Sequence, residues 1–368
     1  MAKAAIGQIC SSNSMTHNLA QCVKLVGQAA GVGAKILFLP EASDYIGTSA
    51  QESLSLARPV ASSPFVTGLQ VAAARHAIAV HVGIHVPVAV KPLDAAHADG
   101  KKILSRALNP VVPSIPESEG SLKTSATSTA TPAQDTTSAE RTKLYNRTIY
   151  ITPTGTILPT ASYNKLHLFD YATLRESAST QAGSSLIPPI HSPIGRLGSL
   201  ICFDLRFPEP AIHLTSPPNH DPSPTPSNES GRHLPAQILL YPSAFTVPTG
   251  RAHWEVLLRA RAIETQSYVI AAAQVGEHNV DVSSPPSHEG PKKKPRVSYG
   301  HSMVVDPWGR VILEMKGVRP DWDGENAEDS VEEGAVGEMG IVDIDLGEWE
   351  RVREKMPLIR RNDVYPEI

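Results

Sequence analysis

The sequence lacks the features that mark secreted, disulfide-bonded or membrane proteins. It contains only three cysteines, Cys10, Cys22 and Cys202, too few and too irregularly spaced for a disulfide framework or a zinc site. No apolar run approaches the roughly 20 residues that a transmembrane helix needs. The N-terminus lacks the apolar stretch and cleavage site of a secretory signal. The sequence therefore predicts an intracellular, cytoplasmic protein, with a mitochondrial or nuclear pool left open.

The sequence also lacks an excess of charge of either sign. The formal net charge is -4 at pH 7, so no basic surface indicates nucleic acid or a membrane as a partner. The basic segment 292–296 is similar to a nuclear localisation signal, but short basic runs are more often solvated loop charge. Hydrophobic residues make up 41% of the chain, enough for a sizeable core. We therefore expect a soluble globular protein.

Short buried strands alternate with amphipathic helices along the chain. A helix is predicted from Thr16, as its N-cap, to about Ala34, and a buried strand then ends at Leu39. The other expected elements are the helices Pro64–His76, Ala252–Gln266 and Glu348–Lys355, and the strands Ala4–Cys10, Ile78–Ile84, Tyr145–Ile151, Ile157–Leu166, Arg196–Phe203, Ile238–Tyr241, Tyr268–Gln274, His301–Asp306, Val311–Met315 and Gly340–Ile344. This order predicts an α/β fold with helices packed on sheets.

Four segments have the composition of surface loops. They lie near residues 87–142, 215–233, 278–296 and 318–338, and are rich in Ser, Thr, Pro or charged residues. Regular strands or helices resume after each one, as expected when loops are inserted into a single fold. The sequence therefore predicts one domain over residues 1–368, carrying surface insertions.

Cys202 is the first candidate for chemistry. It ends an apolar strand shortly before Pro208 and a predicted helix. A sharp strand-to-helix turn exposes a side chain beside backbone N–H groups, which suits the nucleophile of an acyl transfer. The alternative is a buried structural cysteine, since free cysteine is among the most buried residues.

Glu41 and Lys165 also lie at predicted strand ends. Glu41 follows a buried strand, where α/β proteins place their clefts, and could act as a general base. Lys165 could stabilise an oxyanion and a cysteine thiolate. A solvated loop acid and a surface lysine are the alternatives. The three residues are far apart in sequence, so only a fold could bring them together.

Three segments resemble the signature motifs of the nitrilase superfamily, carbon–nitrogen hydrolases with a Glu–Lys–Cys triad. The segments are residues 38–41, 163–170 and 199–209, in the family's order. The resemblance runs from about Ala4 to the C-terminus outside the insertions. It implies an α/β four-layer α-β-β-α sandwich, no metal or organic cofactor, and a homodimer or higher homo-oligomer. It also implies Glu41 as the base, Lys165 as the proton donor and oxyanion stabiliser, and Cys202 as the nucleophile.

Residues 242–246, 249–264 and 299–309 are most similar to the branch that hydrolyses deaminated glutathione to 2-oxoglutarate and cysteinylglycine. The superfamily resemblance implies that Glu176 is an additional active-site glutamate, whereas by itself it would be an ordinary solvated acid. The resemblance also implies that Arg206 and Thr249 hold the 2-oxo acid end of the substrate, a task that suits a guanidinium. An ion pair of Arg206 with Asp204 or Glu209, and a plain turn at Thr249, are the structural alternatives.

Two other functions stay open. The first is an ω-amidase that acts on 2-oxoglutaramate, or a broader hydrolase of small amides and nitriles. The second, of another class, is a non-catalytic binding protein on the same fold, because fold alone does not prove function.

Overall fold

The computed structural model describes residues 1–90, 141–171, 174–216, 234–280, 296–322, 324, 330–361 and 364–365. Its contacts divide the chain into two units. One comprises residues 1–88 and 144–368, and the other comprises residues 89–143, of which only 89–90 and 141–143 are described. The account below concerns the first unit.

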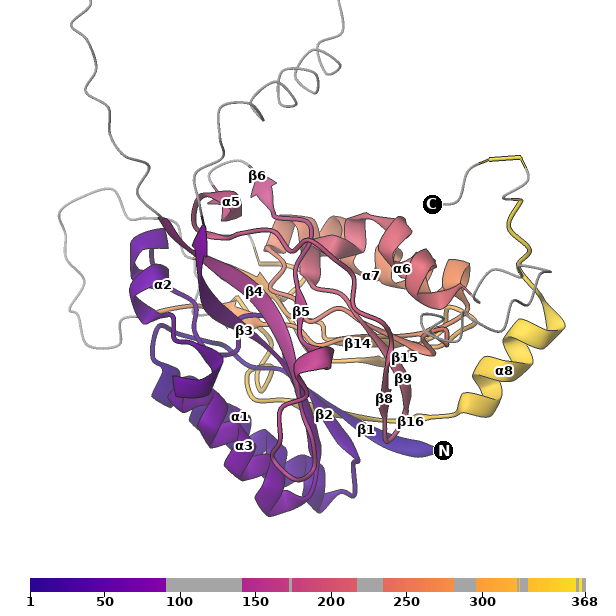
Figure 1. The fold of residues 1–368 in the computed structure, drawn as a ribbon, viewed down its shortest axis with the longest axis horizontal. Coiled ribbons are helices and arrows are strands. Elements are labelled where there is room, and N and C mark those ends of the chain that lie inside the picture. Colours follow the sequence, from indigo (N-terminus) through magenta and orange to yellow (C-terminus); the bar gives the residue numbers. More distant parts are fainter. Residues whose placement is uncertain are drawn as a thin grey trace, which may run out of the picture. The chain divides into compact units, whose positions relative to one another are not determined.

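Two six-stranded sheets form the centre of this unit (Figure 1). The first sheet has the strand order β16 (Met339–Ile344), β1 (Ala2–Gly7), β2 (Ile36–Phe38), β3 (Ala79–Val90), β4 (Arg141–Ile151) and β5 (Tyr163–Asn164). The second has the order β15 (Val311–Glu314), β14 (Met303–Val305), β11 (Tyr268–Ala271), β10 (Ile238–Leu240), β9 (Gly195–Ser199) and β8 (Ile190–Ser192). In each sheet three neighbouring strands run parallel, β1 to β3 in one and β9 to β11 in the other. The carboxyl ends of parallel strands are where such folds place their sites.

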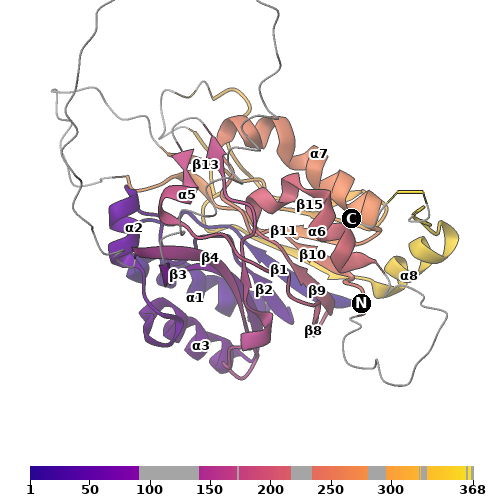
Figure 2. The ribbon, with the colours of Figure 1, turned by 45° about the horizontal axis from the view of Figure 1, so that its top comes forward.

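Two pairs of helices cover the outer faces of the sheets (Figures 1 and 2). The helices are α1 (Met15–Gly31) and α3 (Pro64–His76) on the first sheet, and α6 (Pro208–Thr215) and α7 (Val247–Thr265) on the second. The remaining elements are α2 (Ala50–Leu56), α5 (Glu176–Ser179), α8 (Leu346–Lys355), the 3-10 turns η1 (Val60–Ser62), η3 (Pro159–Ala161) and η4 (Cys202–Arg206), and the two-stranded pairs β12 (Val275–Glu277) with β13 (Val297–Tyr299) and β6 (Asp170–Tyr171) with β7 (Leu174–Arg175).

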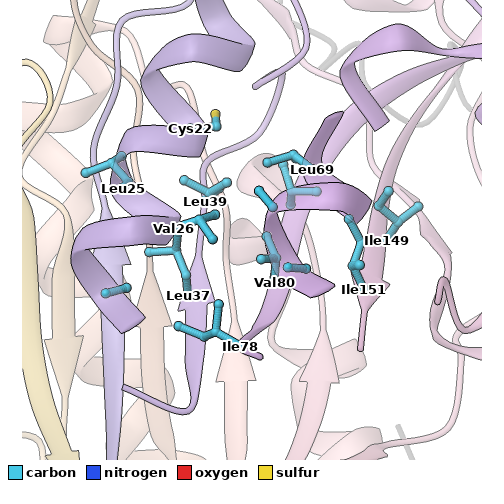
Figure 3. Close-up of a cluster of buried hydrophobic side chains, with 14 of the residues drawn as sticks. Cys22, Leu25, Val26, Leu37, Leu39, Leu69, Ile78, Val80, Ile149 and Ile151 are labelled. Atoms are coloured by element: carbon cyan, nitrogen blue, oxygen red, sulfur yellow. The ribbon is translucent and has the colours of Figure 1, made fainter. Parts of the chain in front are cut away.

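Three clusters of buried apolar side chains join these layers. One lies between the first sheet and its helices, where Leu25 and Leu69 meet Leu37 and Ile149 (Figure 3). A second joins the two sheets, and a third joins the second sheet to α6 and α7. Because alternate residues of a strand point to opposite faces, each sheet supplies side chains to two clusters. The predicted four-layer α-β-β-α sandwich is confirmed.

Several predicted boundaries are wrong for identifiable reasons. Helix α1 begins at Met15, because the Ser14 hydroxyl and not Thr16 accepts the capping hydrogen bond. Helix α7 begins at Val247, five residues before the expected Ala252, since a proline at the second position is compatible with a helical first turn.

Several strands are shorter than expected, and two of them bear on the site. The strand expected over Ile157–Leu166 is interrupted by η3. Ile157 forms an isolated bridge to Ile151 and Tyr163–Asn164 pairs with β4, while Pro159 between them has no N–H for a ladder bond. The strand expected over Arg196–Phe203 ends at Ser199, before the chain turns into η4. Both shortened strands lead directly into the candidate site.

Much of the four expected insertions lies outside the described residues, namely 91–140, 217–233, 281–295, 323 and 325–329. The described part of 318–338 is packed and not simply solvated, because Val318 bridges to Val331 while Ser330 and Ala335 are fully buried. The single-domain organisation stays a prediction. No helix among the described residues has the length and apolar character to cross a membrane.

Leu69 gives a direct test of the helix–sheet cluster. Its side chain is fully buried in α3, whereas Val71 of the same helix is 54% exposed. We expect Leu69→Ala to lower the free energy of unfolding by about 2–5 kcal/mol, because it removes apolar contacts and leaves a cavity. Val71→Ala should change it by no more than about 0.5 kcal/mol. Urea denaturation measures both, and equal effects would contradict this packing.

Candidate active site

Glu41 lies in a tight turn just after β2, at the carboxyl end of the parallel strands. The turn is held against β3, because the Gly83 N–H donates to the Pro40 carbonyl at 3.0 Å and the Ser43 N–H donates to the Gly83 carbonyl at 2.9 Å. The buried Gln274 amide donates to the Glu41 carbonyl at 2.9 Å. Glu41 is only 5% exposed. It is therefore a buried, fixed carboxylate and not a solvated loop acid.

Lys165 follows β5, and both its backbone N–H and its backbone carbonyl are hydrogen-bonded. Its N–H donates to the Asn146 carbonyl at 2.9 Å, and its carbonyl accepts from the Gly183 N–H at 2.8 Å. The residue is 2% exposed. An ammonium taken out of water in this way needs carboxylate partners. The alternative of a surface lysine is wrong.

Cys202 begins η4 with a φ of +46°, a left-handed conformation that residues other than glycine seldom adopt. Such backbone strain clusters at functional sites. The Cys202 N–H donates to the Pro242 carbonyl at 3.0 Å, so this N–H is committed and does not serve an oxyanion. The structure confirms the predicted sharp turn and shows that this buried cysteine lies in a strained conformation.

Four of the six predicted site residues meet. The Lys165 Nζ lies 3.0 Å from Glu41 Oε1 and 2.9 Å from Glu176 Oε2. Cys202 belongs to the same cluster, because its side chain is among the groups that lower the pKa of the Glu41 carboxyl. Glu176 begins α5, and its Oε2 accepts the Phe169 N–H at 2.7 Å. The cluster thus combines two carboxylates, one ammonium and one thiol.

These groups shift one another's proton affinities. Burial would raise the pKa of Glu41, but the Lys165 charge and hydrogen bonds from Cys202, Lys165 and Asn146 hold it below its ordinary value. Burial would lower the pKa of Lys165, but the charges of Glu176 and Glu41 raise it well above its usual range. Burial and the Glu41 charge raise the pKa of the Cys202 thiol. At rest the cluster holds a neutral thiol beside an ionised base.

Asp204 ties the lysine segment to the cysteine turn, which was not predicted. It is fully buried, and its Oδ2 accepts from the Tyr163 hydroxyl at 2.7 Å and the Ile201 N–H at 3.0 Å. Its Oδ1 accepts from the N–H and Nδ1 of His167 at 2.9 and 2.8 Å. Tyr163 and His167 flank Lys165 on both sides, and Ile201 precedes the cysteine. Residue spacing alone could not reveal a carboxylate shared by two distant segments.

The two predicted substrate-binding residues form no hydrogen bond to the cluster within the described residues. Arg206 is exposed, and its Nη2 donates to His253 Nδ1 at 2.9 Å, so the suggested ion pair with Asp204 is not formed. The Thr249 hydroxyl, in the first turn of α7, donates to the Thr246 carbonyl at 3.1 Å. Their roles in substrate binding stay predictions.

Arg296 is a cation whose pKa is affected by the charges of the cluster, and it was not predicted to belong to the site. Its carbonyl accepts the His278 N–H at 2.9 Å, one residue before β13. The residue is exposed, yet enough protein surrounds its guanidinium that burial lowers its pKa, while the charges of Glu41, Glu176 and Cys202 oppose that shift. Arg296 is the last residue of the basic segment 292–296, which was expected to be solvated loop charge. Residues 292–295 lie outside the described residues.

Known proteins match this chain over most of its length. A family model described as carbon-nitrogen hydrolase matches residues 3–101, 124–218 and 232–354. The chain is 36% identical to a probable hydrolase of Schizosaccharomyces pombe, covering 100% of both. It is 34% identical to the deaminated glutathione amidase of Mus musculus, covering 98% of this chain and 84% of that one. The crystal structure of the Caenorhabditis elegans NitFhit protein matches with a TM-score of 0.65 and 30% identity, covering 99% of this chain and 67% of that one. The chain spans 61% of the curated sequence of that nitrilase and fragile histidine triad fusion protein.

Gly83 tests how tightly the Glu41 turn is held. A Cβ at Gly83 would lie 2.6 Å from the Glu41 Cα and 2.9 Å from the Pro40 carbonyl oxygen, so the turn would have to move. We expect Gly83→Ala to lower kcat for amide hydrolysis by about tenfold or more, because small displacements of a catalytic group are costly. Steady-state kinetics measures this. Gly31→Ala, where a Cβ would meet nothing within 4 Å, is the control. An unchanged kcat for Gly83→Ala would contradict the close approach.

Proposed function

The chain belongs to the carbon–nitrogen hydrolase family, and on that premise we propose that it hydrolyses the amide bond of deaminated glutathione with Cys202 as nucleophile. It is an amidase-type carbon–nitrogen hydrolase. The observation that carries the proposed mechanism is the cluster itself: a buried base, a buried ammonium and a thiol on a strained turn. Those are the groups that acyl transfer needs.

The first half of the reaction forms a thioester. Glu41 takes the proton of the Cys202 thiol while the sulfur attacks the amide carbonyl carbon. The tetrahedral oxyanion then lies beside the Lys165 ammonium, and one such donor contributes roughly 10²–10³ in rate. Glu41 passes the proton to the amide nitrogen and the C–N bond breaks. Cysteinylglycine leaves, and the 2-oxoglutaryl group stays on the sulfur.

The second half regenerates the enzyme. A water molecule gives a proton to Glu41 and attacks the thioester carbonyl, and Lys165 again stabilises the oxyanion. The C–S bond breaks, the proton returns to the Cys202 sulfur, and 2-oxoglutarate is released. Glu176 keeps the ammonium in place through both halves, because it binds Lys165 Nζ with both oxygens, at 2.9 and 3.1 Å. General base assistance of this kind contributes roughly 10²–10⁴ in rate.

Two considerations support a substrate with a 2-oxo acid end. The first is the 34% identity to a relative named deaminated glutathione amidase. The second is the presence of two guanidinium groups. Arg206 is implied by the family resemblance, and Arg296 is included because the charges of Glu41, Glu176 and Cys202 act on its pKa. A guanidinium can bind a carboxylate through two parallel hydrogen bonds.

An ω-amidase acting on 2-oxoglutaramate, or a broader hydrolase of small amides and nitriles, would use the same groups. With 2-oxoglutaramate the acyl part is unchanged and only the leaving group differs, ammonia in place of a peptide amine. The proposal therefore depends on the identity of the released amine, which product analysis reads directly.

Turnover of the two substrates tests this choice. We expect a higher kcat/KM for deaminated glutathione than for 2-oxoglutaramate, with cysteinylglycine and 2-oxoglutarate as products. Cys202→Ala should lower kcat by at least about a thousandfold, because no nucleophile remains. Cys22→Ala, a buried cysteine in the α1 cluster, is the matched control and should keep its turnover.

The outcomes separate substrate from mechanism. A preference for 2-oxoglutaramate would leave the mechanism intact and make the substrate assignment wrong. Full activity in Cys202→Ala on either substrate would remove the nucleophile from the proposal.

Arg296→Gln and Arg206→Gln test which guanidinium binds the acid end. We expect each substitution that removes a carboxylate contact to raise KM about tenfold with little change in kcat, because a charge-assisted hydrogen bond is worth about 1.5–3 kcal/mol. Steady-state kinetics measures both constants. Arg259→Gln is the control, since Arg259 is exposed and forms an ion pair with Glu255 on α7. Unchanged KM values in both variants would show that neither guanidinium contacts the substrate.

A further inference from the structure

Asn146 lies between the two carboxylates of the cluster. Asn146 lies on β4 and is only 4% exposed. Its Nδ2 donates to Glu41 Oε1 at 2.5 Å and to Glu176 Oε1 at 3.3 Å. The same two oxygens lie 3.0 and 3.1 Å from Lys165 Nζ. Each of the two carboxylates is therefore held by the ammonium and by one neutral amide. Nothing in the sequence motifs singles out Asn146.

The amide can act in only one orientation. In the reverse orientation Oδ1 would face both carboxylates, which would lose two hydrogen bonds and oppose like partial charges. In the observed orientation Oδ1 is buried and has no hydrogen-bond partner among the described residues. Buried acceptors are rarely left unpaired. The fold therefore accepts an unpaired oxygen so that both N–H groups of the amide can donate.

The neutrality of the amide also matters. Glu41 and Glu176 share one ammonium, so the ionised cluster carries an excess of negative charge, which tends to retain a proton. A second cation in place of Asn146 would hold the carboxylates but would weaken Glu41 as a base. A third carboxylate would add to the repulsion. An amide supplies two hydrogen bonds to the charged forms without adding charge.

We propose that Asn146 is a positioning residue that holds the Glu41 and Glu176 carboxylates against Lys165. The inference rests on the proposed function, in which Glu41 is the base. It goes beyond that function because Asn146 takes part in no step of the proposed reaction and acts only through the carboxylates that it binds. The effect of its hydrogen bond on Glu41 has the required direction, since it lowers the pKa of that carboxyl group.

Two substitutions test the proposal through the pH profile of kcat/KM. Asn146→Ala removes the donor, so the pKa of Glu41 rises and the acid limb of the profile moves to higher pH. A move of about one unit lowers kcat/KM about tenfold on that limb. Asn146→Asp keeps the shape and adds a carboxylate, so we expect a larger move in the same direction. KM should stay within about threefold of the wild-type value in both, because substrate contacts are intact.

Asn164 provides the matched control. It lies on β5 beside β4, and its Oδ1 accepts from Arg147 Nε at 2.7 Å, away from the carboxylates. Asn164→Ala and Asn164→Asp should leave the acid limb where it is in the wild type. If Asn146→Ala is too unstable to assay, the isosteric Asn146→Asp carries the test. An acid limb that does not move in the Asn146 variants would overturn the proposal.

A second readout separates this proposal from the proposed function. Alkylation of Cys202 by iodoacetamide needs Glu41 as a base but needs no amide substrate. We expect the acid limb in the pH profile of the alkylation rate to move to higher pH in Asn146→Ala, as the acid limb of kcat/KM does. A moved alkylation limb in a protein without amidase activity would support the positioning role and reject the function. If the protein is an active amidase but the acid limbs of both the alkylation rate and kcat/KM stay where they are in the wild type, the function would be supported and the positioning role rejected.

Discussion

The contact between the Lys165 ammonium and two carboxylates is the constraint on which the rest of the site depends. Lys165 is 2% exposed, and it bonds to both Glu41 and Glu176. An unpaired charge at such a position would cost several kcal/mol, so these three residues must be brought together by the fold. The ammonium in turn keeps Glu41 ionised, and the ionised Glu41 raises the pKa of the Cys202 thiol. A proton is therefore ready to move from sulfur to carboxylate when a substrate carbonyl arrives.

The two sheets supply opposite sides of this cluster. The first sheet provides Glu41 after β2 and Lys165 after β5, while the second sheet provides Cys202 after β9. Apolar packing between the sheets sets their separation, but it does not fix the positions of single atoms. Asp204 fixes these positions more closely, because its carboxylate accepts hydrogen bonds from residues close to both Lys165 and Cys202. Gln274 has a similar effect on the turn that carries Glu41.

The predictable part of the site is the part that depends on local sequence. Glu41 and Cys202 follow apolar strands, and the carboxyl ends of parallel strands share one edge, so their approach could be expected from the α/β order and the family resemblance. Asn146 could not be found in this way. Its role depends on the register of β4 against β5, where Arg147 pairs with Asn164, and on the orientation of one amide. The break at η3 and the end of β9 at Ser199 could not be found in this way, because the flanking apolar residues favour continuous strands.

The destabilising features of the cluster argue against a non-catalytic binding protein. Replacing a buried ion pair by apolar residues of similar size is often neutral or stabilising. A left-handed conformation at Cys202 costs about 1–3 kcal/mol, which a glycine would avoid. The Asn146 Oδ1, which has no hydrogen-bond partner among the described residues, adds a further cost. A protein that served only as a scaffold would gain stability by losing any of these features. Their coincidence around one thiol has a chemical reason only if that thiol reacts.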